Sequence, residues 1–142
     1  MNIINSLPIL KLGDSVEIIA PASRCTDQRL KDTMSLLTEW HLNPIISDTL
    51  FAPDLLCANT DENRFNNLKK ALFNPATKAI IIAKGGYGSI RLLSKLNELQ
   101  PPKSNKIFVG MSDSISLQIF LQQKWGWPTI HGTLAKDRIS FE

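Results

Sequence analysis

Short aliphatic runs alternate with amphipathic segments along this chain. Four such runs, at residues 16–20, 44–46, 79–83 and 107–109, predict β-strands, and residues 129–130 are a candidate fifth. The runs at 79–83 and 107–109 are continuously apolar, which is typical of strands buried on both faces of a sheet. The pattern therefore predicts a core built around a central sheet.

Between these runs, apolar residues recur at the spacing of one helix face. Asp27 is placed to cap the first helix, whose inward side carries Leu30, Met34 and Leu37. Further sets with this spacing are Phe65, Leu68 and Leu72; Ile90, Leu93 and Leu96; and Ile115, Ile119 and Phe120. Strands that alternate with helices predict right-handed βαβ units. We therefore expect an α/β fold, a small three-layer sandwich with a mainly parallel sheet, flavodoxin-like or Rossmann-like.

Length and composition are those of one globular domain. The chain has 142 residues, of which 43% are apolar and 20% charged, so it can bury a core and is not disordered as a whole. Its net charge of +3 comes with a single adjacent basic pair, Lys69-Lys70, which disfavours nucleic acid and anionic membranes as partners. No apolar stretch approaches the roughly 18 residues of a membrane span, and residues 1–13 lack the pattern of a secretory signal. A cytoplasmic location is therefore expected.

The loops that follow the predicted strands are where chemistry is expected. Open α/β sheets bind ligands at the carboxyl ends of their strands. Loops of this kind occupy residues 21–26, 84–89 and 110–113. The long connection at residues 47–59 either holds an extra short strand or forms a functional loop.

Ser112 has the setting of a nucleophile elbow, which places a serine on a tight turn between a strand and a helix. It closely follows residues 107–109, and Gly110 removes a side chain that would crowd the turn. The helix N-terminus behind it offers free N–H groups to a developing oxyanion. The alternative is that Ser112 or Asp113 only caps the helix. The full GxSxG pattern is absent, because Ser114 replaces the second glycine.

Two glycines, Gly85 and Gly86, follow the preceding buried strand. Glycine lets a ligand approach the backbone closely, so this loop could hold an anion; the alternative is a tight strand-to-helix turn. Sequential strands are usually neighbours, so an amide of this loop could face Ser112 and join the N–H of Asp113 as a second oxyanion donor. His131 could act as a base, or it could be structural or line a pocket.

Motifs in a fixed order resemble one known family. They are residues 18–23 (IIAPAS), 58–64 (ANTDENR), 85–88 (GGYG) with RLL at 91–93, and 110–117 (GMSDSISL). Together they resemble the N-terminal domain of the serine L,D-carboxypeptidases. That family includes the muramoyl-tetrapeptide carboxypeptidases of cell-wall recycling and the microcin C immunity peptidases. The resemblance runs from about Asp14 to Gly132.

The resemblance implies a serine peptidase that acts through an acyl-enzyme on Ser112, with the Asp113 and Gly86 amides as its oxyanion hole. The expected substrate is the murein tetrapeptide, which would lose its terminal D-Ala. No metal or organic cofactor is implied, and a homodimer is compatible with the family. Substrate contacts are expected from Gly85, Tyr87, Ser23 and His131.

Several positions depart from the family pattern. Asn59 replaces a usual glycine, Lys84 a usual arginine, Ser116 a usual threonine and Thr133 a usual proline. Lysine keeps the charge of arginine but loses its planar fork of donors. None of these changes touches Ser112, but they leave open how the substrate carboxylate is held.

A second domain follows this one in the family and supplies the Glu and His of a Ser-Glu-His triad. Residues 1–142 are therefore interpreted as the nucleophile-bearing N-terminal domain, without those partners and inactive alone. One alternative is a stand-alone domain that binds peptidoglycan fragments without catalysis. Another is a peptidase of the microcin C immunity type, acting on peptide- or aminoacyl-nucleotides.

Overall fold

The computed structural model describes residues 7–134 and contains a five-stranded sheet in which every paired strand is parallel. The strand order is β2-β1-β3-β4-β5, which is the flavodoxin-like order. The strands are β1 (Ser15–Ile19), β2 (Asn43–Ile46), β3 (Thr77–Ile82), β4 (Ile107–Gly110) and β5 (Thr129–His131). The predicted strands, including the candidate at residues 129–130, are thus confirmed.

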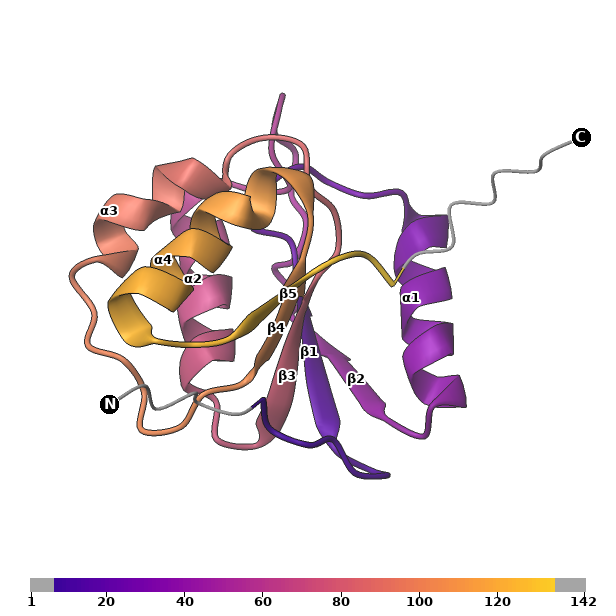
Figure 1. The fold of residues 1–142 in the computed structure, drawn as a ribbon. Helices are drawn as coiled ribbons and strands as arrows, with labels where there is room; N and C mark the ends of the chain where they lie inside the picture. Colours follow the sequence, from indigo (N-terminus) through magenta and orange to yellow (C-terminus); the bar gives the residue numbers. More distant parts are fainter. Residues whose placement is uncertain (1–6, 135–142) are drawn as a thin grey trace, which may run out of the picture.

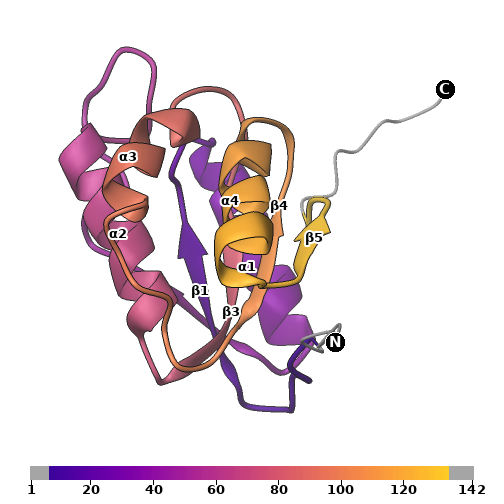
Figure 2. The same ribbon diagram turned by 60° about the vertical axis from the view of Figure 1, so that its left-hand side comes forward.

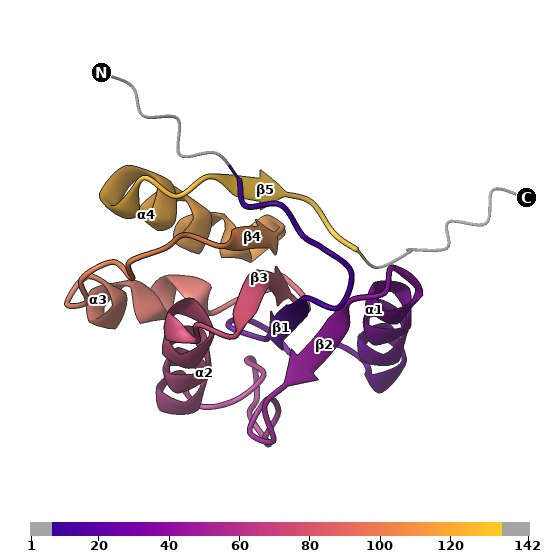
Figure 3. The ribbon, with the colours of Figure 1, turned by 90° about the horizontal axis from the view of Figure 1, so that it is seen from below.

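Helices cover both faces of the sheet. Helix α1 lies on one face, and α2, α3 and α4 lie on the other (Figures 1 and 3). The helices are α1 (Asp27–Glu39), α2 (Asp61–Phe73), α3 (Leu93–Leu96) and α4 (Ile115–Trp125), with short 3-10 segments η1 (Ser89–Leu92) before α3 and η2 (Ser112–Ser114) before α4. Each face has its own apolar core, one centred on Val16 and Ile81 and the other on Ile80 and Phe108. The three-layer α/β prediction is confirmed.

Two details of the predicted helices were wrong. Thr26, not Asp27, caps α1, because the Thr26 hydroxyl accepts a 3.2 Å hydrogen bond from the Arg29 N–H. Ile90, Ile115 and Ile119 do not face the core, since they are 57%, 44% and 45% exposed. The buried residues of α4 are Leu117, Gln118 and Leu121. Apolar residues occur on both sides of α4, so their spacing alone could not select its inner face.

The connection between β2 and α2 contains no strand at residues 47–60. It is an ordered loop held by buried amide side chains. Asn59 and Asn67 both donate to the Thr49 carbonyl, at 2.8 and 3.0 Å. The loop therefore keeps a fixed shape without strand pairing.

The carboxyl ends of β1, β3 and β4 lie side by side at one edge of the sheet, at the top of Figure 2. The loops at residues 20–26, 83–88 and 110–112 leave from this edge. In the described part of the chain, no helix is long and apolar enough to cross a membrane. The boundary expected with a second domain, near Glu142, lies outside the described residues.

Candidate active site

Ser112 sits on a left-handed turn between β4 and α4. Its φ is 55°, and Met111 before it is extended, with φ −144° and ψ 166°. Non-glycine residues rarely adopt positive φ, and when they do the site is often functional. A side chain at Gly110 would collide with the Ser114 hydroxyl and approach Ile82 Cγ1 to 2.9 Å. The turn is therefore as sharp as the sequence predicted, and Ser112 is exposed on it.

Helix capping does not account for Ser112 or Asp113. The residue at the N-cap of α4 is Ser114, and that helix has no side-chain cap hydrogen bond. The Asp113 carboxylate instead accepts hydrogen bonds from Ser89, on the neighbouring loop. Among the described residues, no hydrogen bond involves the Ser112 hydroxyl. The Ser112 hydroxyl therefore contributes no hydrogen bond to the described part of the fold.

The glycine loop after β3 packs directly against this turn. A methyl at Gly85 would lie 2.6 Å from Ser112 Cβ and 3.1 Å from Ser112 Oγ. Gly86 has a φ of 101°, which only glycine adopts readily. The N–H groups of Gly86 and Asp113 donate to no other described residue. Two loops far apart in sequence thus meet at the serine.

Gly85→Ala should destabilise the chain by distorting the serine turn. The added methyl would also lie 3.0 Å from the Met111 carbonyl oxygen, so backbone must move to make room. We expect the free energy of unfolding to fall by about 1–3 kcal/mol in urea titrations. Gly132→Ala is the matched control, because its methyl meets no described atom within 4 Å. Equal stability of the two variants would contradict the close packing of Gly85.

Ser23 joins three loops at this edge. Its hydroxyl accepts from the Tyr87 N–H at 3.1 Å and donates to the Leu56 carbonyl at 3.0 Å. Its own N–H donates to the Gly85 carbonyl at 3.2 Å. Ser23 was predicted to bind substrate, and these bonds commit its hydroxyl to loop support. Tyr87, also predicted to bind substrate, presents a side chain that is about half exposed.

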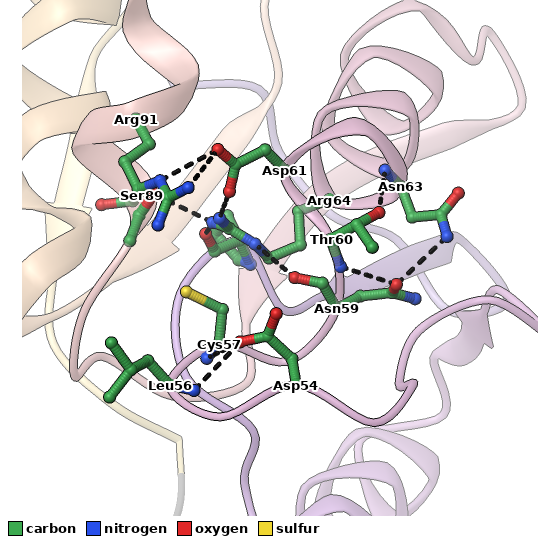
Figure 4. Close-up of polar contacts among 12 residues, drawn as sticks. Asp54, Leu56, Cys57, Asn59, Thr60, Asp61, Asn63, Arg64, Ser89 and Arg91 are labelled. Carbon is green, nitrogen blue, oxygen red and sulfur yellow. Dashed lines mark hydrogen bonds and ion pairs between the residues drawn. The ribbon is translucent and has the colours of Figure 1, made fainter.

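Arg64 is fully buried beneath these loops, and sequence reasoning gave it no role of its own. Its Nε donates to the Asn59 carbonyl and its Nη1 to the Gly88 carbonyl, both at 2.9 Å. Nη1 also donates to the Pro21 carbonyl, and Nη2 pairs with the Asp61 carboxylate. Figure 4 shows Asp61 between the guanidinium groups of Arg64 and Arg91. One buried side chain thus fixes the backbone of three loops.

The ring of His131 is held by Gln118. Gln118 is buried, and its Nε2 donates to the Ile130 carbonyl at 2.8 Å, so its Oε1 must act as an acceptor. That oxygen lies 3.0 Å from His131 Nδ1. In the neutral imidazole, Nδ1 therefore carries the proton and Nε2 is left as an acceptor. His131 is exposed and pairs with Gly110, the glycine that opens the serine turn.

Nitrogen NMR of the 142-residue chain can test this tautomer. In neutral His131, we expect a protonated Nδ1 and an unprotonated Nε2 in two-bond proton–nitrogen correlations recorded at alkaline pH. Gln118→Leu should abolish the preference, because it removes the acceptor at 3.0 Å. His41, which follows α1, provides an internal reference in the same spectra. An Nε2-protonated His131 in the unmodified chain would contradict the assignment.

The two cysteines do not compete with Ser112 as nucleophiles. Cys25 and Cys57 are both buried. Burial raises the pKa of each thiol, despite the opposing effect of nearby arginines. The thiolate is the reactive form, so a raised pKa lowers the reactivity of both side chains at neutral pH. Among the described residues, no group of three metal-ligating side chains converges on a common point.

A parallel α/β sheet with a serine on a left-handed turn at its carboxyl edge has the geometry of proteins that carry a nucleophile elbow. The chain belongs to the LD-carboxypeptidase N-terminal domain family, which matches residues 16–132. This confirms the resemblance that the motifs indicated.

Relatives and solved structures agree with this membership. The chain is 38% identical over 130 residues to a Rickettsia conorii protein named as a carboxypeptidase, covering 90% of this chain and 40% of that protein. It is 32% identical over 122 residues to the murein tetrapeptide carboxypeptidase of Pseudomonas aeruginosa, covering 84% and 39%. A MccF-like protein of Bacillus anthracis has a similar fold, with a TM-score of 0.79, 27% identity and coverage of 90% and 40%. The chain thus spans about 40% of the length of these relatives.

Proposed function

We propose that this chain is the nucleophile-bearing domain of a serine L,D-carboxypeptidase. The enzyme would hydrolyse the amide to the terminal D-Ala of murein tetrapeptide during cell-wall recycling. The observation that carries the proposal is the left-handed turn at Ser112, with φ 55° and an exposed hydroxyl. Membership of the LD-carboxypeptidase family supports it, as does the name of the Pseudomonas aeruginosa relative.

In this mechanism Ser112 Oγ attacks the carbonyl carbon of the scissile amide. A histidine from a following domain takes the hydroxyl proton. The Gly86 and Asp113 N–H groups stabilise the oxyanion of the tetrahedral intermediate. Collapse expels the D-Ala amine, which receives the proton, and leaves an acyl group on Ser112. Water then hydrolyses that ester by the same steps. Gly85, Tyr87 and His131 would contact the substrate, and Ser23 would hold the loop that carries Tyr87.

Two other functions are compatible with this site. The likeness to the MccF-like protein favours a microcin C immunity-type peptidase, whose substrates would be aminoacyl- or peptide-nucleotides. The second alternative is a domain that binds peptidoglycan fragments at the same turn without cleaving them. Both keep the same site and differ in substrate or in turnover.

The test compares the chain with a joined protein. We define the joined protein as this chain followed by the C-terminal domain of the Rickettsia conorii relative, which is 38% identical over the part it shares with this chain. Both are incubated with murein tetrapeptide and D-Ala release is measured. We expect release by the joined protein and none by the chain alone, because an isolated serine hydroxyl is a poor nucleophile.

Matched substrates separate the alternatives. A tetrapeptide that ends in L-Ala should not be cleaved, and an aspartyl-nucleotide should be cleaved slowly or not at all. Preference for the nucleotide would favour the immunity-type peptidase. Binding of tetrapeptide without release by either protein would favour the binding domain. Release by the chain alone would make His131 the leading candidate for the base and would overturn the two-domain mechanism.

A further inference from the structure

The side chain of Asp113 bridges the serine turn to the glycine loop. Its Oδ2 accepts hydrogen bonds from the Ser89 N–H at 2.8 Å and from the Ser89 hydroxyl at 2.6 Å. Ser89 is the first residue of η1 and is completely buried. The carboxylate therefore holds the first N–H of η1 and the Ser89 hydroxyl, 24 residues away in sequence.

A second hydroxyl makes this contact rigid. Ser116 Oγ lies 2.9 Å from Ser89 Oγ and 3.2 Å from the Asp113 carbonyl oxygen, so its hydroxyl can donate to either. The Ser89 hydroxyl is also 2.7 Å from that carbonyl, so its proton is shared between the carbonyl and the carboxylate. Ser89 is buried, and Asp113 and Ser116 are partly buried, so these hydrogen bonds are partly shielded from water. Backbone and side chain of Asp113 are thus fixed by the same neighbour.

The two N–H groups of the proposed oxyanion hole sit on either side of this bridge. Gly86 lies three positions before Ser89, and the other donor is the N–H of Asp113 itself. In the described part of the chain, the bonds among Ser89, Asp113 and Ser116 are the only hydrogen bonds that join residues 84–92 to residues 110–116. The Asp113–Ser89 contact therefore ties the glycine loop directly to the serine turn, whereas Ser23 and Arg64 hold the glycine loop from other loops.

We propose that the Asp113 carboxylate is a positioning group that sets the spacing of the two oxyanion donors. This rests on the proposed function of Ser112 and the two amides. Oxyanion donors stabilise the transition state only when they are held about 2.7–3.1 Å from the developing charge. Loss of the carboxylate lets the glycine loop move away from the turn. The donors are then present but misplaced, and turnover falls while ground-state binding of substrate remains.

Kinetics of the joined protein test the proposal. Asp113→Ala should lower kcat for D-Ala release by about 100-fold, and KM should stay within about threefold. Asp113→Asn should restore most of kcat, because its amide oxygen can still accept from Ser89. Ser89→Ala should lie between these two, since it keeps the N–H donor and loses the hydroxyl. Asp48→Ala is the control and should behave as wild type, because Asp48 is exposed and makes no hydrogen bond to Ser89, Asp113 or the glycine loop.

Crystal structures of the 142-residue variants give a readout that needs no activity. In Asp113→Ala, the distance between Gly86 N and Asp113 N should change by about 1 Å, and in Asp113→Asn it should not. An unmoved loop, or a kcat within threefold of wild type in Asp113→Ala, would overturn the proposal. A raised KM at unchanged kcat would overturn it too and make Asp113 a substrate ligand. If the joined protein without substitutions were inactive, that result would count against the proposed function instead. The crystal structures would still show whether the Asp113 carboxylate sets the distance between Gly86 N and Asp113 N.

Discussion

Ser112→Ala is expected to lower kcat of the joined protein for D-Ala release by about 10⁴-fold or more. The substitution removes the oxygen that would form the acyl-enzyme. The residual rate would come from substrate binding and from the oxyanion donors, which remain. Stability should stay within about 1 kcal/mol of wild type, because the Ser112 hydroxyl makes no hydrogen bond with other described residues. Release of D-Ala and urea denaturation are measured on the same preparations.

Ser94→Ala is the control for this experiment. Ser94 is an exposed serine of α3, so the same chemical change there should leave both rate and stability unaltered. Mass spectrometry adds a direct readout, since a slow substrate should acylate the unmodified protein and the Ser94 variant only. Activity of Ser112→Ala within tenfold of wild type would remove Ser112 from the mechanism.

Arg64→Met should destabilise the 142-residue chain by about 3–5 kcal/mol. The substitution leaves the carbonyls of Pro21, Asn59 and Gly88 without their buried donor, and Asp61 without one of its two arginine partners. A buried polar group without a hydrogen bond lowers the free energy of unfolding far more than an exposed ion pair raises it. Urea or thermal denaturation followed by circular dichroism measures the loss.

Arg91→Met is the matched control, because Arg91 pairs with the same carboxylate of Asp61 at 2.8 Å but is 47% exposed. Exposed ion pairs contribute about 1 kcal/mol or less, so this variant should remain close to wild type. Similar losses in the two variants would mean that the charge on Asp61 matters and that the carbonyl contacts of Arg64 do not.

The features that could be predicted from sequence are local ones. The strands were visible as apolar runs, and the turn at Ser112 was visible because strand, glycine, serine and helix follow one another within a few residues. The prediction of the α1 cap was wrong although it also rested on neighbouring residues. Thr26 and Asp27 are both good capping residues, and only the backbone geometry selects Thr26.

The features that sequence reasoning missed join residues that are distant in the chain. Arg64 contacts carbonyls 43 and 24 residues away, and a carbonyl accepts a hydrogen bond whatever its side chain. Nothing in residue type therefore marks Pro21 or Gly88 as its partners. The signal that could have found Arg64 is its place three residues after Asp61 near a helix start, which allows an ion pair but does not predict burial. Ser89 was missed for the same reason.

The left-handed backbone conformation of Ser112 creates a trade-off between thermal stability and activity. An L-residue with a φ of 55° holds strain of about 1 kcal/mol or more that glycine would not have. A library of variants selected only for heat resistance should therefore enrich glycine at codon 112, and with it lose the hydroxyl. Selection that also demands peptide cleavage should retain serine there and gain its stability at positions remote from the turn. At position 112, selection for stability and selection for activity would therefore favour different residues.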